Sequence, residues 1–170
     1  AAFGGSREGN KDVSIWLSKN HYNNWLKPKM IDTGISSDGI DYPCWNPVLF
    51  KSRSGKLTLF YKVGPSPREW WGMYKTSSDN GKNWSSSTRL PNGILGPIKN
   101  KPIQLENGTI ISPSSTEIKN EEGLSWKIHV EMSDDDGANW KKIPIDQKTK
   151  FDVIQPSVLI HDEGRLQLLC

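Results

Sequence analysis

The chain has 170 residues, of which 34% are hydrophobic, and a formal net charge of +3. A charge this small does not indicate a nucleic-acid or membrane-surface partner, because such partners select strongly basic patches or tails. No stretch of the sequence approaches the roughly 18 apolar residues of a membrane span.

The predicted elements are short strands throughout. The first unit has an apolar strand end at 1–5, a polar loop to residue 12, a strand at 13–17, a turn at 18–25 and a returning strand at 27–31. The second unit has strands near 46–51, 57–63, 70–76 and 87–90. The third has strands near 101–105, 109–113, 125–132 and 141–145, and a fourth unit begins at Ile154. Turn-forming residues recur roughly every 8–12 residues without helical periodicity, which predicts an all-β repeat fold.

One turn sequence recurs along the chain. Residues 77–84 and 133–140 share the pattern Ser-x-Asp-x-Gly-x-x-Trp, and residues 18–25 are a weaker copy with Asn for Asp and Tyr for Gly. The Asp or Asn side chain is expected to bond backbone amides two residues further on, while Gly takes the left-handed conformation. Trp25, Trp84 and Trp140 are then expected to pack back onto their sheets at equivalent structural positions.

A second repeat has the same period. Pro47, Pro102 and Pro156 each lead into an apolar strand and a turn glycine, about 55 residues apart. Four antiparallel strands per unit, with the Trp turn in the last hairpin, predict a β-propeller whose blades are 1–32, 46–90, 101–145 and an incomplete 154–170. Because propellers close with about four to eight blades, we expect a longer polypeptide, with the remaining half of the propeller as partner.

The repeated turns resemble the Asp-boxes of the sialidase superfamily, also called bacterial neuraminidase (BNR) repeats. Other strings are similar to the sialidase-like BNR family, and they cover nearly the whole chain: 3–9, 12–16, 45–50, 60–64, 93–102, 154–156 and 166–170. The resemblance corresponds to about the first half of such a protein and implies a six-bladed propeller. It also implies that the family's Tyr/Glu nucleophile pair and its arginine triad lie outside these 170 residues.

The resemblance places a catalytic acid in the loop before the strand at 13–17. Asp12 and Glu8 both fit this region, and the spacing does not choose between them. A carboxyl among apolar neighbours has a raised pKa and can protonate a leaving oxygen. Arg7, in the same loop, is expected to contact the substrate. The alternative is a solvated loop in which these carboxylates pair with Arg7.

A second loop, at 64–71, combines a guanidinium with aromatic side chains. Arg68 can grip a carboxylate in bidentate fashion, and Trp70 can stack on the face of a sugar. Packing against a neighbouring blade is the alternative role for these side chains.

Polar residues at the starts of the inner strands form the third group. Asn46, Lys101 and Gln155 each precede a repeated Pro, and Lys99 and Asn100 lie beside Lys101. Equivalent positions in a propeller ring the central axis, so these residues are expected to contact a ligand there. A water-filled central channel is the alternative.

The first functional hypothesis is a sialidase-like glycoside hydrolase that acts on a terminal acidic sugar of a glycan. It would need no cofactor or metal. The alternative is a catalytically inactive carbohydrate-binding propeller with the same pocket. A scaffold that binds protein is a third class, and it fits less well because the polar residues converge on the axis.

The two cysteines match no metal or redox spacing. Cys44 and Cys170 are both expected to be free, buried thiols. No targeting segment defines the compartment, and a secreted or periplasmic location is favoured among the possibilities.

Overall fold

The computed structural model describes residues 1–36, 38–121, 123–146 and 152–170. Its strands are antiparallel, and the only helical element in this part of the chain is the 3-10 turn η1 (Asp162–Gly164). The prediction of an all-β fold is therefore confirmed. Among these residues no helix has the length and apolar character needed to cross a membrane.

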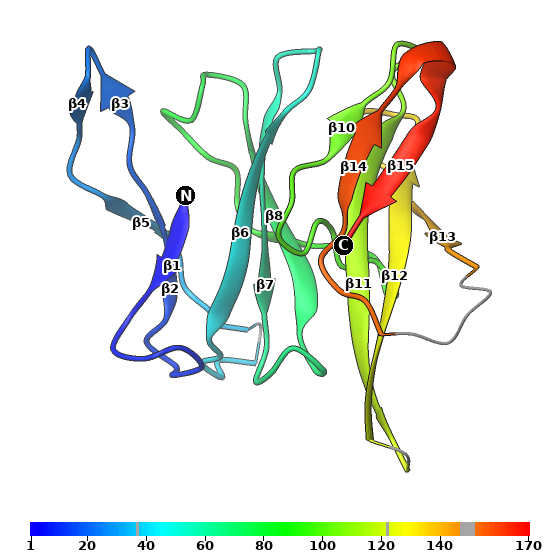
Figure 1. Ribbon diagram of the computed structural model, residues 1–170. Helices are drawn as coiled ribbons and strands as arrows, with labels where there is room; N and C mark the ends of the chain where they lie inside the picture. The colour runs from blue at the N-terminus through cyan, green and yellow to red at the C-terminus, as the bar shows by residue number, and fades with distance from the viewer. Residues whose placement is uncertain (37, 122, 147–151) are drawn as a thin grey trace.

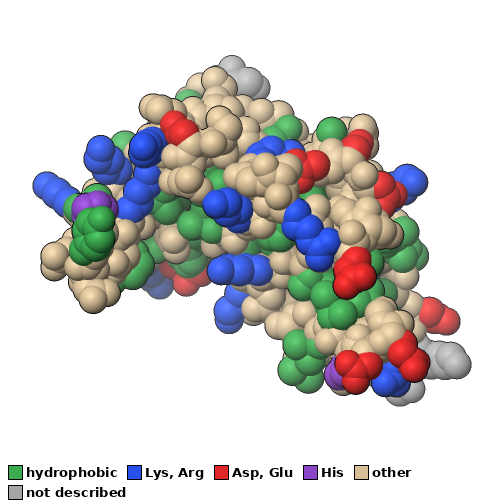
Figure 2. Space-filling model, turned by 90° about the horizontal axis from the view of Figure 1, so that it is seen from above, with side chains coloured by type: hydrophobic (Ala, Val, Ile, Leu, Met, Phe, Trp, Pro, Cys, Tyr) green, Lys and Arg blue, Asp and Glu red, His purple; other side chains and the backbone are tan. Residues whose placement is uncertain are grey.

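The strands form separate sheets that stand side by side along the chain (Figure 1). The first sheet contains β1 (Ala2–Gly4), β2 (Ser14–Leu17) and β5 (Lys29–Asp32), and beside it lies the hairpin of β3 (Asn20–His21) and β4 (Asn24–Trp25). The second sheet contains β6 (Cys44–Lys51), β7 (Leu57–Val63), β8 (Trp71–Ser77) and β9 (Thr88–Arg89). Seen from above, the outline of the molecule is curved and has one concave edge (Figure 2).

The third sheet differs from its predicted outline in one hairpin. It contains β10 (Ile103–Gln104), β11 (Ile110–Asn120), β12 (Gly123–Ser133) and β13 (Lys141–Pro144), and the fourth sheet contains β14 (Ser157–Ile160) and β15 (Leu166–Leu169). β11 and β12 pair without a break from Ile110 to Asn120. The hairpin therefore runs past the lower ends of the other sheets (Figure 1), beyond the predicted strand at 109–113. Its Ser and Thr residues look like a turn in sequence, but they pair as strand.

Strand β7 supplies the centre of the core. Successive side chains of a strand point to opposite faces, and six of the seven β7 residues are buried. On one face Leu59 and Tyr61 pack with Ile15 of the first sheet. On the other face Phe60 packs with Ile110 of the third sheet. The second sheet is thus covered by apolar contacts on both sides.

The two intact repeat turns have the same hydrogen bonds. The Ser77 hydroxyl accepts the Gly81 N–H at 2.8 Å, and the Asp79 carboxylate accepts the Asn83 N–H at 2.9 Å. The matching bonds after β12 join Ser133 to Gly137 and Asp135 to Asn139, at 2.8 Å each. The prediction that Asp bonds the amide two residues on is wrong, because the serine hydroxyl takes that amide and the Asp bonds the amide four residues on.

These bonds predict a dependence of stability on acid pH. The backbone N–H and the side-chain amide of Asn139 are the main causes that lower the pKa of Asp135 to about 2, and Asn83 likewise lowers the pKa of Asp79. A carboxyl with a lowered folded-state pKa stabilises the fold above its unfolded value, and this stabilisation is lost as pH falls through the folded value. We therefore expect Tm to fall between about pH 4 and pH 2.

The test compares Tm by circular dichroism across that pH window in the wild type and in the double variant Asp79→Asn/Asp135→Asn. The variant removes both titrating groups, so it should be less stable at neutral pH and show a flatter decline in acid. Asp162→Asn, at an exposed carboxylate, serves as control. An equally steep decline in the double variant would contradict the assignment.

The weaker copy of the turn does not form the hydrogen bonds of the two intact turns. Tyr22 and Asn23 have φ values of 48° and 66° and close a two-residue hairpin between β3 and β4. Because the chain reverses there, Trp25 does not return onto the sheet and is 71% exposed. The predicted equivalence of Trp25 with Trp84 and Trp140 is therefore wrong. The hairpin stands at the left edge of Figure 2.

The cysteines differ in their surroundings. Both are free, but Cys44 is buried and Cys170 is exposed. Burial raises the pKa of the Cys44 thiol to about 12. The prediction of a buried thiol is confirmed for Cys44 and wrong for Cys170, which lies beyond the last strand.

Candidate functional site

A cavity of about 210 Å³ lies where the second and third sheets meet the loop at 5–13. The loops at 5–13 and 64–70 lie at the lower end of the molecule in Figure 1, opposite the Asp-box turns. Seven side chains around the cavity carry polar or aromatic groups: Glu8, Trp45, Asn46, Trp70, Ser115, Glu117 and Gln155.

Two tryptophans form one wall of this cavity. Trp45 is 8% exposed, and its Nε1 donates to the Gly64 carbonyl at 2.8 Å. The Trp70 ring packs edge-on against it, with centroids 6.0 Å apart. A Cβ at Gly64 would lie 2.4 Å from the Trp70 Cα, and Gly64 has a φ of 149°, so glycine is required at this close approach. The half-buried Trp70 is thereby held at the cavity.

Asn46 and Gln155 occupy equivalent backbone positions. Their φ values are 43° and 57°, and each residue directly precedes a Pro. Non-glycine residues take this left-handed conformation at a cost of order 1–3 kcal/mol, and such residues cluster at functional sites. Both also line a second cavity of about 400 Å³, together with Lys99 and Phe3. The two amides therefore lie between the two cavities.

The third predicted group is brought together only in part. Lys99 lines the 400 Å³ cavity. The Asn100 Nδ2 donates to the Gln155 carbonyl at 2.8 Å and to the Pro156 carbonyl at 3.1 Å, so it holds the start of the fourth sheet. Lys101 is exposed and is not among the residues around either cavity.

The two acid candidates are in different surroundings. Glu8 lines the 210 Å³ cavity, whereas Arg7 and Asp12 do not. The Asp12 carboxylate accepts the Ser6 N–H at 2.6 Å and the Ser6 hydroxyl at 2.9 Å, and these bonds lower the pKa of this exposed group. The expectation for an acid in this loop is a raised pKa. For Asp12 that prediction is wrong, because its carboxylate closes the loop.

Arg68 forms an ion pair with Glu117, one of the residues that line the cavity. Its Nη1 lies 3.5 Å from Oε1 of Glu117, and the Trp126 Nε1 donates to the other Glu117 oxygen at 3.2 Å. Sequence reasoning misses Glu117, because it places the end of this strand at residue 113. It also misses Trp45, although its place beside Asn46 in the Trp-Asn-Pro string is a usable signal.

A buried polar network holds the loop at 93–102, next to these cavities. The Glu131 carboxylate accepts the Leu95 and Gly96 N–H groups at 2.7 Å each, and the Lys62 Nζ donates to the Pro97 carbonyl at 2.8 Å. Both charged side chains are fully buried, and burial lowers the pKa of Lys62 to about 7. The network therefore fixes the backbone of residues 95–97. In the described part of the chain, no group of three or more His, Cys, Asp or Glu side chains is arranged to hold a metal.

These features define an all-β repeat protein. A polar and aromatic cavity lies at the end of its sheets that carries the loops at 5–13 and 64–70. The model of the BNR repeat-like domain matches residues 1–170. The chain therefore belongs to the BNR repeat-like domain family.

Two solved structures share the fold. A protein of unknown function from Dyadobacter fermentans has a TM-score of 0.70 and 18% identity, and the match covers 96% of this chain and 52% of that one. The Hadza microbial sialidase Hz136 has a TM-score of 0.68 and 13% identity, with 89% of this chain and 34% of that one covered. At these identities the likeness concerns the fold alone.

A curated protein also matches in sequence. It is an ATP-dependent helicase/nuclease polypeptide from Bacillus thuringiensis subsp. konkukian, 29% identical over an alignment of 136 residues, and the match covers 74% of this chain and 10% of that protein. The chain thus spans one tenth of this curated relative and about half or less of the two solved structures.

Proposed function

We propose that this chain supplies the saccharide-binding wall and the proton donor of a sialidase-like glycoside hydrolase that acts on a terminal acidic sugar. The sheets would be blades of a six-bladed propeller, with blades at 1–32, 46–90, 101–145 and 154–170. The carrying observation is that Glu8, Trp70, Asn46 and Gln155 surround one cavity at the loop end of the molecule.

Each of these groups has a role in holding a sugar. The half-buried Trp70 offers an apolar ring to a sugar face, and the amides of Asn46 and Gln155 can donate to and accept from hydroxyls. Arg68 would bind the sugar carboxylate by exchanging it for Glu117, since a guanidinium pairs with either carboxylate in the same geometry. Lys99 would add positive charge from the neighbouring cavity.

Glu8 is the better placed of the two acids. It lines the cavity, whereas Asp12 does not line it and is held by two bonds from Ser6. As the bond from the anomeric carbon to the leaving oxygen breaks, the Glu8 proton would pass to that oxygen. Sialidases use a Tyr nucleophile, and the remaining half of the propeller would supply it.

The test measures kcat/KM of the full-length protein on an alkyl sialoside and on an aryl sialoside with a good leaving group. Glu8→Gln should lower the alkyl rate about a hundredfold and the aryl rate much less, because a good leaving group needs no proton. Asp12→Asn is the matched control and should stay close to wild type. A loss confined to Asp12→Asn would transfer the role to Asp12, and full activity of both variants would remove this loop from the mechanism.

A carbohydrate-binding propeller without hydrolysis is the second candidate. Two observations favour it: Arg68 is paired with Glu117, and the carboxylate of Asp12 is held by Ser6. Neither group is then available for the reaction. Wild-type protein that binds a sialoside without cleaving it, and loses this binding in Trp70→Ala, would establish this alternative.

A further inference from the structure

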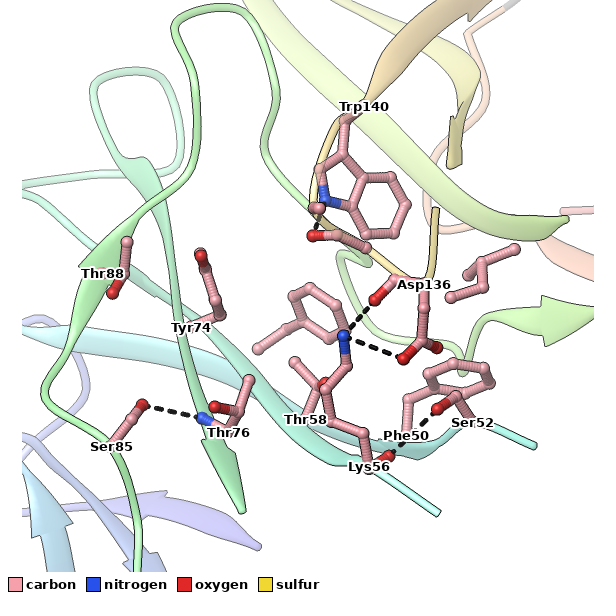
Figure 3. Close-up of a pocket in the computed structure, with 14 residues that line it drawn as sticks. Phe50, Ser52, Lys56, Thr58, Tyr74, Thr76, Ser85, Thr88, Asp136 and Trp140 are labelled. Carbon is pink, nitrogen blue, oxygen red and sulfur yellow. Dashed lines mark hydrogen bonds and ion pairs between the residues drawn. The ribbon is translucent and has the colours of Figure 1, made fainter. Parts of the chain in front are cut away.

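A separate cavity of about 340 Å³ lies at the Asp-box end of the molecule, between the second sheet and the turn after β12. Figure 3 shows its walls. Phe50, Lys56 and Thr58 come from β6, β7 and the turn between them, Tyr74 and Thr76 come from β8, and Asp136 and Trp140 belong to the Asp-box turn. None of these residues lines the Glu8 cavity. The volume is within the range of about 300–1,000 Å³ typical of small-molecule sites.

Aromatic rings contribute to the walls of this cavity. Trp140 packs edge-on against Phe60 at a centroid distance of 5.9 Å, and Tyr74 lies 6.5 Å from the same ring. Trp140 and Tyr74 are only partly buried, so part of each ring faces the cavity. An apolar ring surface of this kind suits the C–H face of a sugar.

Hydroxyl groups line the side of the cavity that β8 and β9 form. Tyr74, Thr76 and Thr88 line the cavity, and within the described residues their side-chain hydroxyls form no hydrogen bond with protein. The Ser85 hydroxyl is already used, since it accepts the Thr76 N–H at 3.0 Å and donates to the Ser86 carbonyl. Three free hydroxyls beside an aromatic ring offer both donors and acceptors to a ligand.

The charges at the cavity cancel. Lys56 Nζ lies 3.0 Å from the Asp136 carboxylate, and it also donates to the Asp136 carbonyl. The Ser54 hydroxyl donates to the same carboxylate at 2.9 Å. An anionic ligand would have to break this pair, and an apolar ligand would leave the hydroxyls without partners, which costs binding energy.

We propose that this cavity is a second carbohydrate site, which binds one neutral sugar unit between the rings of Tyr74 and Trp140 and the hydroxyls of Thr76 and Thr88. The site is distinct from the acidic-sugar cavity around Glu8 and lies at the other end of the sheets. The site would hold a glycan by one of its neutral sugar units and would take no part in bond cleavage.

The experiment titrates the full-length protein with the methyl glycosides of glucose, galactose, mannose and N-acetylglucosamine and follows binding by saturation-transfer NMR. At least one of them should bind with a Kd of about 1 mM. The double variant Thr76→Val/Thr88→Val keeps β-branched side chains at strand positions, so it should fold, and it should bind at least tenfold more weakly. Tyr74→Phe keeps the ring and should give a smaller loss.

Trp70→Ala is the control for the Glu8 cavity, and it should leave the binding of neutral sugars unchanged. The proposal is overturned if none of the four glycosides binds at tens of millimolar, if the valine variant binds as tightly as wild type, or if Trp70→Ala abolishes binding. None of these results depends on sialoside hydrolysis, so the two proposals can fail separately.

Discussion

Glu131→Gln is expected to lower the free energy of unfolding by about 1–3 kcal/mol, the cost of leaving a buried hydrogen-bonding group without its partner. The carboxylate accepts the Leu95 and Gly96 N–H groups at 2.7 Å each and is fully buried. A glutamine has one acceptor oxygen and a donor NH₂ group, so one of the two N–H groups would face another donor. Buried Lys62 would also lose its nearby negative charge.

Urea unfolding of the wild type and the variant measures this loss. Glu106→Gln is the matched control, because Glu106 is exposed in the turn between β10 and β11, and its substitution should change stability by no more than about 0.5 kcal/mol. Equal losses in the two variants would show that the buried carboxylate is not what holds the loop at 93–102.

The repeats predict most of the fold because they report local geometry. The Asp-box pattern defines its own turn through side-chain bonds, and Asp79 and Asp135 make the same bonds at both sites. The number of strands in the second and third sheets follows from the same period. The long β11–β12 hairpin is not predictable, because its Ser and Thr residues carry no alternating apolar pattern and pair only in the context of the sheet.

The candidate site is predictable where it depends on topology. Asn46 and Gln155 lie at equivalent positions, as the repeated Pro indicates, and both share a cavity with Glu8 and Trp70. The bonds that a side chain makes within its own loop are not predictable. Asp12 closes its loop on Ser6, and Arg68 is engaged by Glu117 from the neighbouring sheet. Such partners depend on distances between atoms in the folded chain, and the spacing of residues in the sequence does not give these distances.

Trp140→Ala is expected to cost about 2–3 kcal/mol of folding free energy, less than the roughly 3–5 kcal/mol of a fully buried aromatic side chain, because the ring is only partly buried. Its ring packs edge-on against Phe60 at 5.9 Å and borders the core between the second and third sheets, and its Nε1 donates to the Gly137 carbonyl at 3.1 Å. The substitution would remove this contact and open the core at the Asp-box end.

Trp25→Ala is the matched comparison, because the same residue type stands at the end of the weaker copy of the turn. Trp25 is 71% exposed, so its loss should change the unfolding free energy by no more than about 0.5 kcal/mol. Urea denaturation of both variants measures the difference. Similar losses at Trp25 and Trp140 would mean that the β3–β4 hairpin packs against further structure in the folded protein, and a small loss at Trp140 would contradict the role assigned to the Asp-box tryptophan.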